Sequence, residues 1–156
     1  MSVVYLSLGS NIRPEKNIPA CLKLLSETFK VSDVSSIYET APVGPAGKKI
    51  FWNAAVAIRW PGTKGLLAKK IRGLEKKLGR VRDPKNRFRA RSIDIDILPQ
   101  KDYEKFAFIM IPLAEIAPEK KDRKIRKTYR QMADKLHKEN HVFRVRGRAA
   151  RNISSS

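Results

Sequence analysis

A chain of 156 residues with 42% hydrophobic residues is long enough for one domain with a packed core and too short for two. The sequence contains no apolar run of about 18 residues and no basic start followed by an apolar stretch. We therefore expect a cytoplasmic protein without a membrane segment. The single cysteine, Cys21, excludes a disulfide within one chain, and its apolar neighbours at helical spacing predict a core position.

The net charge of +19 is unevenly distributed along the chain. Residues 120–156 contain thirteen Lys and Arg against three Asp and Glu, a net of +10, whereas residues 1–119 carry a net of +9. A nucleic acid or another polyanion is therefore a candidate partner of this basic tail. A surface that only serves solubility, or that concentrates anionic substrates, is the alternative.

The apolar pattern predicts alternating strands and helices, and we take the elements in chain order. In the first half we expect a strand at 3–8, a helix that begins near Asn17 and runs to about residue 29, and strands at 31–40 and 51–60. A helix from a Thr63 cap to Gly79 and a strand ending at Leu98 follow. Beyond them we expect a brief strand and a helical turn within 108–118, a helix around 129–136 and a strand at 142–145. This order predicts an α+β sandwich with helices on one face of an antiparallel sheet. We expect residues 1–118 to form the domain, and residues 119–156 a basic extension that is partly helical with a disordered end.

Two carboxylates occupy one face of the predicted strand that ends at Leu98. Side chains alternate along a strand, so Asp94 and Asp96 point to the same side, about 6 to 7 Å apart, while the neighbouring isoleucines point into a core. Hard oxygen ligands at this spacing suit Mg²⁺ beside a phosphate chain. The alternative is an amphipathic strand with a hydrated polar face.

The segment before this strand is strongly basic. From Arg80 to Arg91 it contains six basic side chains and one acidic one. Guanidinium groups bind phosphate oxygens in pairs, so a basic loop next to a metal site indicates a nucleoside triphosphate. A solvated loop, or one that binds nucleic-acid phosphates, is the alternative.

Six blocks in this order resemble the 6-hydroxymethyl-7,8-dihydropterin pyrophosphokinases of folate biosynthesis over about residues 3–118. They are Leu8–Asn11, Tyr38–Gly44, Asn53–Val56, Leu74–Arg82, Arg91–Leu98 and Pro112–Pro118. The resemblance implies a ferredoxin-like fold. It also implies transfer of a diphosphate from ATP to the hydroxymethyl group of a reduced pterin, with release of AMP.

The resemblance assigns roles to residues in three groups. Asp94 and Asp96 would bind two Mg²⁺ ions, and Asp96 would also help to remove the hydroxyl proton. Three arginines would join them in catalysis: Arg80, Arg82 and Arg91. The positions implied for the nucleotide are Glu75, Arg87, Phe88, Arg72 and Ile97. Those implied for the pterin are Thr40, Ala41, Pro42, Val43, Phe51, Asn53 and Phe108. Core packing is the alternative for Phe51 and Phe108, and a place on the helix surface is the alternative for Glu75. Asn53, an amide in an apolar strand, needs hydrogen-bond partners or a ligand.

The chain departs from the family pattern after the acidic strand. A His-Pro element and a following arginine are missing, and Phe106 takes the arginine position. Phe88 stands for a tryptophan in a lid that is one residue longer. Basic residues of the tail could replace the lost contacts: Arg123, Arg126, Lys127 or Arg130. The alternative functions are a divergent relative that binds nucleotide or RNA with weak or no transfer activity, and a pyrophosphokinase of another reduced pterin. The sequence does not indicate the oligomeric state.

Overall fold

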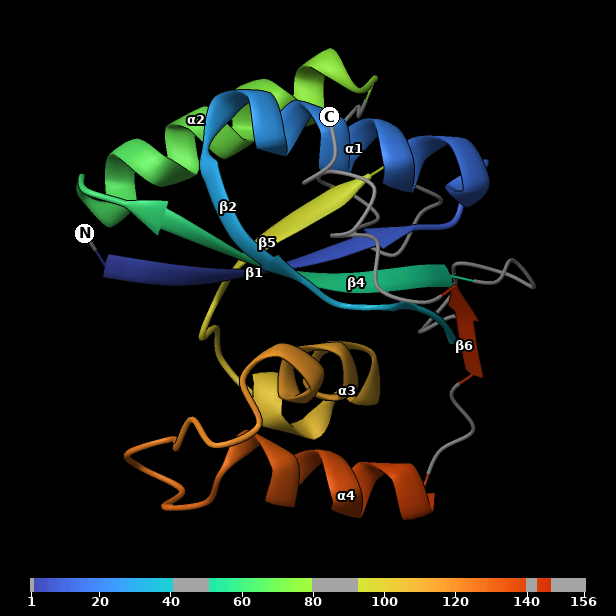
Figure 1. The fold of residues 1–156 in the computed structure, drawn as a ribbon, viewed down its shortest axis with the longest axis vertical. Helices are drawn as coiled ribbons and strands as arrows, with labels where there is room; N and C mark the ends of the chain where they lie inside the picture. Colours follow the sequence, from blue (N-terminus) through green and yellow to red (C-terminus); the bar gives the residue numbers. More distant parts are fainter. Residues whose placement is uncertain (1, 41–50, 80–92, 140–142, 147–156) are drawn as a thin grey trace.

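A computed structural model describes residues 2–40, 51–79, 93–139 and 143–146 (Figure 1). The strands are β1 (Ser2–Ser10), β2 (Lys30–Val34), β3 (Ile37–Thr40), β4 (Phe51–Trp60), β5 (Asp94–Leu98) and β6 (Phe143–Arg146). The helices are α1 (Pro14–Thr28), α2 (Lys64–Lys77), α3 (Ala107–Ile116) and α4 (Tyr129–Glu139), with a 3-10 turn at Tyr103–Lys105. One six-stranded sheet has the order β5-β1-β4-β3-β6, and β2 also pairs with β4. The strand pairs are antiparallel.

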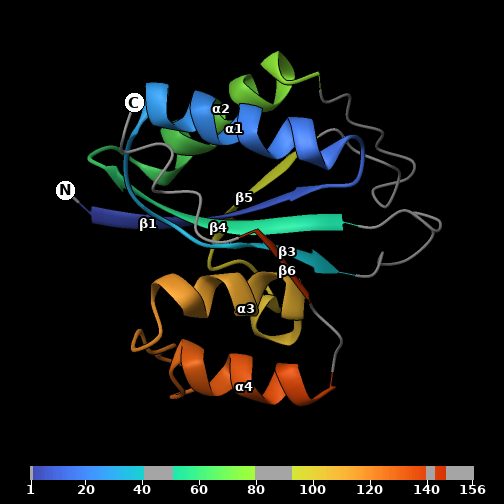
Figure 2. The ribbon, with the colours of Figure 1, turned by 45° about the vertical axis from the view of Figure 1, so that its right-hand side comes forward.

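Helices cover both faces of this sheet. Figures 1 and 2 show α1 and α2 on one side, and α3 and α4 on the other. The predicted α+β class and antiparallel sheet are confirmed. The expectation of helices on one face holds for α1 and α2 only, because α3 and α4 cover the opposite face. No helix among the described residues is long and apolar enough to span a membrane.

The α1/α2 face carries a continuous apolar core. Alternate residues of the strands point into it, including Leu6 of β1, Val56 of β4 and Ile95 of β5, each at most 4% exposed. Cys21 of α1 is fully buried in the same core, which confirms its predicted position. Burial raises the pKa of the Cys21 thiol, and the negative charge of Glu75 raises it further.

The α3/α4 face has a second core, centred on α3. Five consecutive residues of this helix, from Ile109 to Leu113, are buried, because α3 lies between the sheet and α4. The predicted brief strand at this place is wrong. A helix that is apolar on all sides lacks the 3.6-residue periodicity that distinguishes a helix in a sequence.

Local contacts shift two further boundaries. Helix α1 begins at Pro14 rather than near Asn17, since Arg13 adopts the left-handed conformation (φ 41°) and proline suits the first helical position. The expected strand at 31–40 is divided at Ser35 and Ser36, which are fully buried. The Ser35 N–H still donates to the Ala55 carbonyl (2.9 Å), but the Ala55 N–H donates to the Ser35 hydroxyl (2.8 Å), so a side chain replaces one backbone acceptor there.

The described residues after position 118 pack against the rest of the molecule. Tyr129, Met132 and Leu136 of α4 lie in the core beneath α3. Strand β6 pairs with β3, so it extends the sheet by one strand. The described part of the basic tail therefore adds a helix and a strand to the packed unit.

Candidate active site

A row of paired residues crosses four strands near one end of the sheet. Tyr38 of β3 pairs with Asn53 of β4, Asn53 pairs with Gly9 of β1, and Gly9 pairs with Asp94 of β5. Residues paired across neighbouring strands point to the same face, which here is the α3/α4 face. We call these four residues the Asn53 row. The register thus brings Asn53 and Asp94, far apart in sequence, to either side of one glycine.

The close approach of Asn53 requires glycine at position 9. A Cβ atom on Gly9 would lie 3.1 Å from Oδ1 of Asn53, so the amide lies close over the backbone of β1. Asn53 itself is 3% exposed. A side chain at position 9 would displace the amide or occupy the surface between Asn53 and Asp94.

Asp94 and Asp96 project from β5 on the same face as the Asn53 row. Both are partly exposed, whereas Ile95 between them is buried on the other face. This confirms the predicted alternation of the strand. The described residues contain no cluster of three or more His, Cys, Asp or Glu that could hold a metal ion. Two carboxylates fit Mg²⁺, which commonly takes one or two carboxylates and completes its shell with water and substrate phosphates.

Glu75 supports β5 from the opposite face. It is only 2% exposed, and its Oε2 accepts a hydrogen bond from the backbone N–H of Ile95 at 3.0 Å. The alternative of a glutamate on the helix surface is therefore wrong. The sequence gives no local signal for this contact, since it depends on α2 lying against the edge strand β5.

The other predicted site residues within the described part of the chain are dispersed. Phe51 begins β4 and, by alternation, faces the same side as Asn53. Phe108 is the second residue of α3 and packs in the second core, with its ring centre 5.3 Å from that of Phe106. The side chain of Ile97 contacts the α1/α2 core, away from Asp94 and Asp96, and Arg72 lies exposed on α2.

Part of the predicted site lies outside the described residues. These positions are Ala41, Pro42, Val43, Arg80, Arg82, Arg87, Phe88 and Arg91. The backbone of Thr40 is described, and it pairs with Phe51 at the end of β3. The segment from 41 to 50 therefore joins the two strands next to the Asn53 row.

The connection from β5 to α3 is short. Residues 99–106 contain neither histidine nor arginine, and a single 3-10 turn precedes α3. His137, on α4, is exposed. The missing family contacts are therefore not supplied by this connection.

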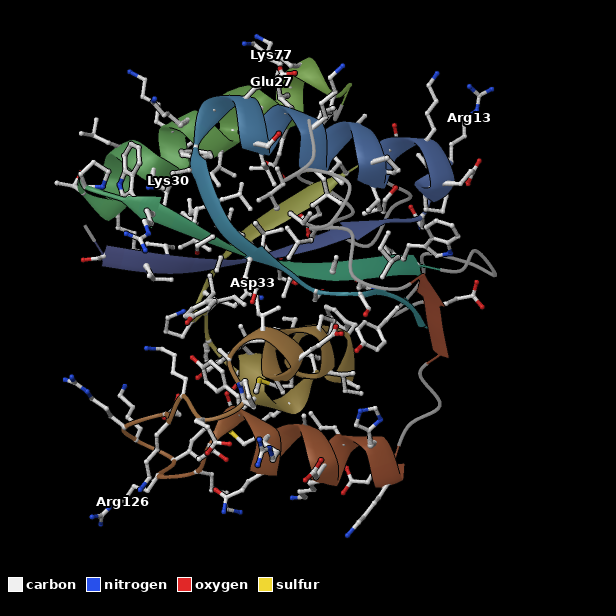
Figure 3. The ribbon with its side chains drawn as sticks, in the orientation of Figure 1. Arg13, Glu27, Lys30, Asp33, Lys77 and Arg126 are labelled. Atoms are coloured by element: carbon white, nitrogen blue, oxygen red, sulfur yellow. The ribbon has the colours of Figure 1, made fainter. Side chains whose placement is uncertain are left out.

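The basic loop between α3 and α4 lies at the other end of the sheet. Lys120 Nζ is 5.8 Å from the ring centre of Tyr5, and Tyr5 pairs with Leu98, about 13 Å along β5 from Asp94. Arg126 points outward from the far end of this loop (Figure 3). This position does not support the hypothesis that the loop replaces the lost phosphate contacts.

An internal hydrogen bond holds the same loop. The Tyr103 hydroxyl donates to Oδ2 of Asp122 at 2.6 Å, and this bond is the main cause that lowers the pKa of Asp122. Burial is the main cause that raises the pKa of Tyr103, and the bond to Asp122 adds to it. The backbone N–H groups of Lys124 and Ile125 donate to Oδ1 of Asp122, both at 2.9 Å.

Taken together, the antiparallel sheet with helices on both faces defines an α+β domain, and Asp94 and Asp96 project side by side from the α3/α4 face of its edge strand. The model of the 7,8-dihydro-6-hydroxymethylpterin-pyrophosphokinase family matches residues 5–118. The chain belongs to this family.

The curated relatives agree with the family match. The chain is 36% identical over 136 residues to the 2-amino-4-hydroxy-6-hydroxymethyldihydropteridine pyrophosphokinase of Methylorubrum extorquens, covering 76% of this chain and 85% of that protein. It is 34% identical over 134 residues to the enzyme of the same name from Pseudomonas aeruginosa, with 74% and 81% covered.

The similar solved structures are longer than this chain. A crystal structure of a Plasmodium falciparum HPPK-DHPS triple mutant matches with a TM-score of 0.71 at 13% identity, over 88% of this chain and 42% of that one. The chain therefore spans less than half of that protein, and at this identity the likeness shows the fold alone.

Proposed function

We propose that the protein transfers a diphosphate from ATP to the hydroxymethyl group of 6-hydroxymethyl-7,8-dihydropterin, giving AMP and the pterin diphosphate. The curated relatives, each covered by more than two thirds of its length, are named for this activity. The observation that carries the proposal is the placement of Asp94 and Asp96 on the same face as Asn53, with only Gly9 between Asn53 and Asp94.

Asp94 and Asp96 hold two Mg²⁺ ions in this proposal. Mg²⁺ held there would supply positive charge that offsets the charge of the triphosphate during attack of the hydroxyl on the β-phosphorus. Asp96 also accepts the hydroxyl proton. Arg80, Arg82 and Arg91 bind phosphate oxygens as bidentate donors, a role that rests on the family resemblance.

The pterin occupies a slot that we define by Asn53, Phe51 and Phe108. The Asn53 amide offers both a donor and an acceptor to the polar edge of the ring. The two phenylalanines supply apolar surface for its faces, and the backbone of 40–43 supplies further hydrogen bonds. The family resemblance implies Arg72, Glu75, Arg87, Phe88 and Ile97 for the nucleotide. Of these, Glu75 and Ile97 are packed on the α1/α2 side, so they contribute indirectly, by supporting β5.

Release of AMP from ATP tests this function. The assay compares AMP formation with and without 6-hydroxymethyl-7,8-dihydropterin, with and without Mg²⁺, and identifies the pterin product by mass. We expect AMP only when both pterin and Mg²⁺ are present. Related reduced pterins, tested in parallel, decide which ring substituents are accepted.

Two outcomes would contradict the proposal. AMP formed at the same rate without pterin would indicate a nucleotide hydrolase, and no AMP at all would show that the missing histidine and arginine are decisive.

RNA binding in place of catalysis is not favoured, because the family match and the curated relatives are pyrophosphokinases. A nonspecific polyanion surface would reveal itself through a steep dependence of RNA affinity on salt.

A further inference from the structure

Glu115, near the end of α3, accepts hydrogen bonds from the sheet through both carboxylate oxygens. The backbone N–H of Ser36 donates to Oε1 at 2.6 Å, and the Ser36 hydroxyl donates to Oε2 at 2.7 Å. The Tyr38 hydroxyl donates to Oε1 at 3.0 Å. Hydrogen bonds to an ionised carboxylate are among the stronger ones in proteins, and three converge here.

The donors belong to the part of the sheet that holds the Asn53 row. Ser36 is fully buried just before β3, and Tyr38 is a member of the row, paired with Asn53. The ring of Tyr38 also packs in a small cluster with Ile111 of α3. Glu115 therefore fixes α3 against the strand that lies next to Asn53.

The same helix carries Phe108 of the pterin slot. Phe108 and Glu115 are seven residues apart, which is about two helical turns and about 10 Å along α3, so they lie on nearly the same side of the helix. The Glu115 contacts thus help to fix the helix that carries Phe108 against the strand that pairs with Asn53. Loss of these contacts would let the helix shift relative to the sheet.

The acids of β5 are held by other contacts. Asp94 and Asp96 lie on an edge strand that pairs with β1 and receives the Glu75 hydrogen bond from α2, on the opposite face. A change at Glu115 therefore acts on the pterin slot and leaves the support of the metal ligands in place.

From this geometry we infer that Glu115 is a positioning residue for the pterin slot, which holds α3 and β3 at the separation that the flat ring requires. The inference rests on the proposed function, because it assumes that the slot binds a pterin. It predicts that pterin affinity depends on Glu115 while ATP affinity does not.

Initial-rate kinetics of Glu115→Gln in the full chain test the inference. The amide removes the negative charge that strengthens all three hydrogen bonds and keeps only one acceptor oxygen, so we expect the KM for pterin to rise about tenfold. The KM for MgATP and kcat should stay within about twofold. Tyr38→Phe removes one donor but keeps the ring, so it should change the pterin KM in the same direction by a smaller factor.

Glu119→Gln is the matched control. Glu119 lies four residues further along, its side chain is 72% exposed, and its ion pair with Arg130 (2.7 Å) is on the surface. Exposed ion pairs contribute little to stability, so this variant should retain the wild-type KM for pterin and the wild-type KM for MgATP.

Three outcomes would overturn the inference. The first is an unchanged pterin KM in folded Glu115→Gln, and the second is an equal rise in the KM of both substrates, which would indicate general loosening. The third applies if Glu115→Gln does not fold. In that case an unchanged pterin KM in Tyr38→Phe would overturn the inference. Wild-type protein without pterin-dependent AMP would instead overturn the proposed function, and this inference with it.

Discussion

The two faces of the sheet use the same strands in different ways. On the α1/α2 face, alternate residues of β1, β4 and β5 form one continuous apolar core. On the α3/α4 face, the second core fills the end near Leu98. At the other end, Asn53 lies on one side of Gly9, and Asp94 and Asp96 lie on the strand on its other side. We call the α1/α2 face the closed face, and the α3/α4 face, on which Asp94 and Asp96 are partly exposed, the open face. A strand such as β5 therefore serves stability and chemistry through alternate residues.

The largest effect should come from Asp96→Asn, on the open face. Loss of the proposed charged metal ligand should lower the rate of AMP formation about a thousandfold or more, because metal ligation contributes several kcal/mol to the transition state. The fold should persist, since Asp96 is partly exposed. Asp102→Asn, a change at a surface aspartate paired with Lys105 (3.3 Å), should leave the rate unchanged. Normal turnover in Asp96→Asn would end the metal assignment.

Glu75→Ala tests the closed face. It removes the buried acceptor of the Ile95 N–H, so the free energy of unfolding, measured by urea titration, should fall by about 2 to 3 kcal/mol. Glu27→Ala, an exposed change on α1 (Figure 3), should stay within about 0.5 kcal/mol of wild type. Equal stability of the two variants would mean that the buried contact does not support β5.

Gly9→Ala tests the close approach of Asn53 to β1 on the open face. Its methyl group would press on Oδ1 of Asn53, so we expect the pterin KM to rise about tenfold through a displaced amide. Gly73→Ala is the matched control, because a Cβ atom there meets nothing within 4 Å. That change should stabilise α2 by about 0.5 to 1 kcal/mol without altering the KM. An unchanged pterin KM in Gly9→Ala would remove Asn53 from the slot.

The smallest effect concerns Asp122, at the end of the sheet away from the acids. Its pKa is lowered in the folded protein, chiefly by the Tyr103 hydroxyl, so its contribution to stability is full above the ordinary aspartate pKa of about 3.9 and is lost as the pH falls through the lower folded value. At neutral pH the melting temperature of Asp122→Asn should be lower than that of wild type, by a shift that corresponds to about 1 kcal/mol of unfolding free energy. The two proteins should converge in acid, and a constant difference across pH would contradict this account.

Local patterns were sufficient to predict most of the fold. The strand at 51–60 and the Thr63 cap of α2 are found as predicted, because alternation and capping are short-range signals. The failures have specific causes. Helix α3 is apolar on all sides, and the division at Ser35 depends on a contact with β4, so neither leaves a periodic signal.

The sequence indicates the residue types of the candidate site but not the contacts that support them. Asp94, Asp96 and Asn53 are recognisable from strand alternation and from a motif. Their supports depend on contacts distant in sequence: the donor and acceptor of the Ser36–Glu115 bonds are 79 residues apart, and those of the Ile95–Glu75 bond are 20 apart. Such contacts follow from the register of the sheet, which a single sequence does not reveal.

The strand order also has a consequence for folding. The first strand of the chain, β1, lies between β4 and β5, and its pairs Tyr5 with Leu98 and Gly9 with Asp94 close most of the chain into one loop. Non-local pairing of this kind slows folding, because the chain must lose the entropy of loop closure before the contacts form. During synthesis, β1 cannot complete its pairing until β5 has left the ribosome. The surface that joins Asn53 to Asp94 is therefore among the last parts of the sheet to form.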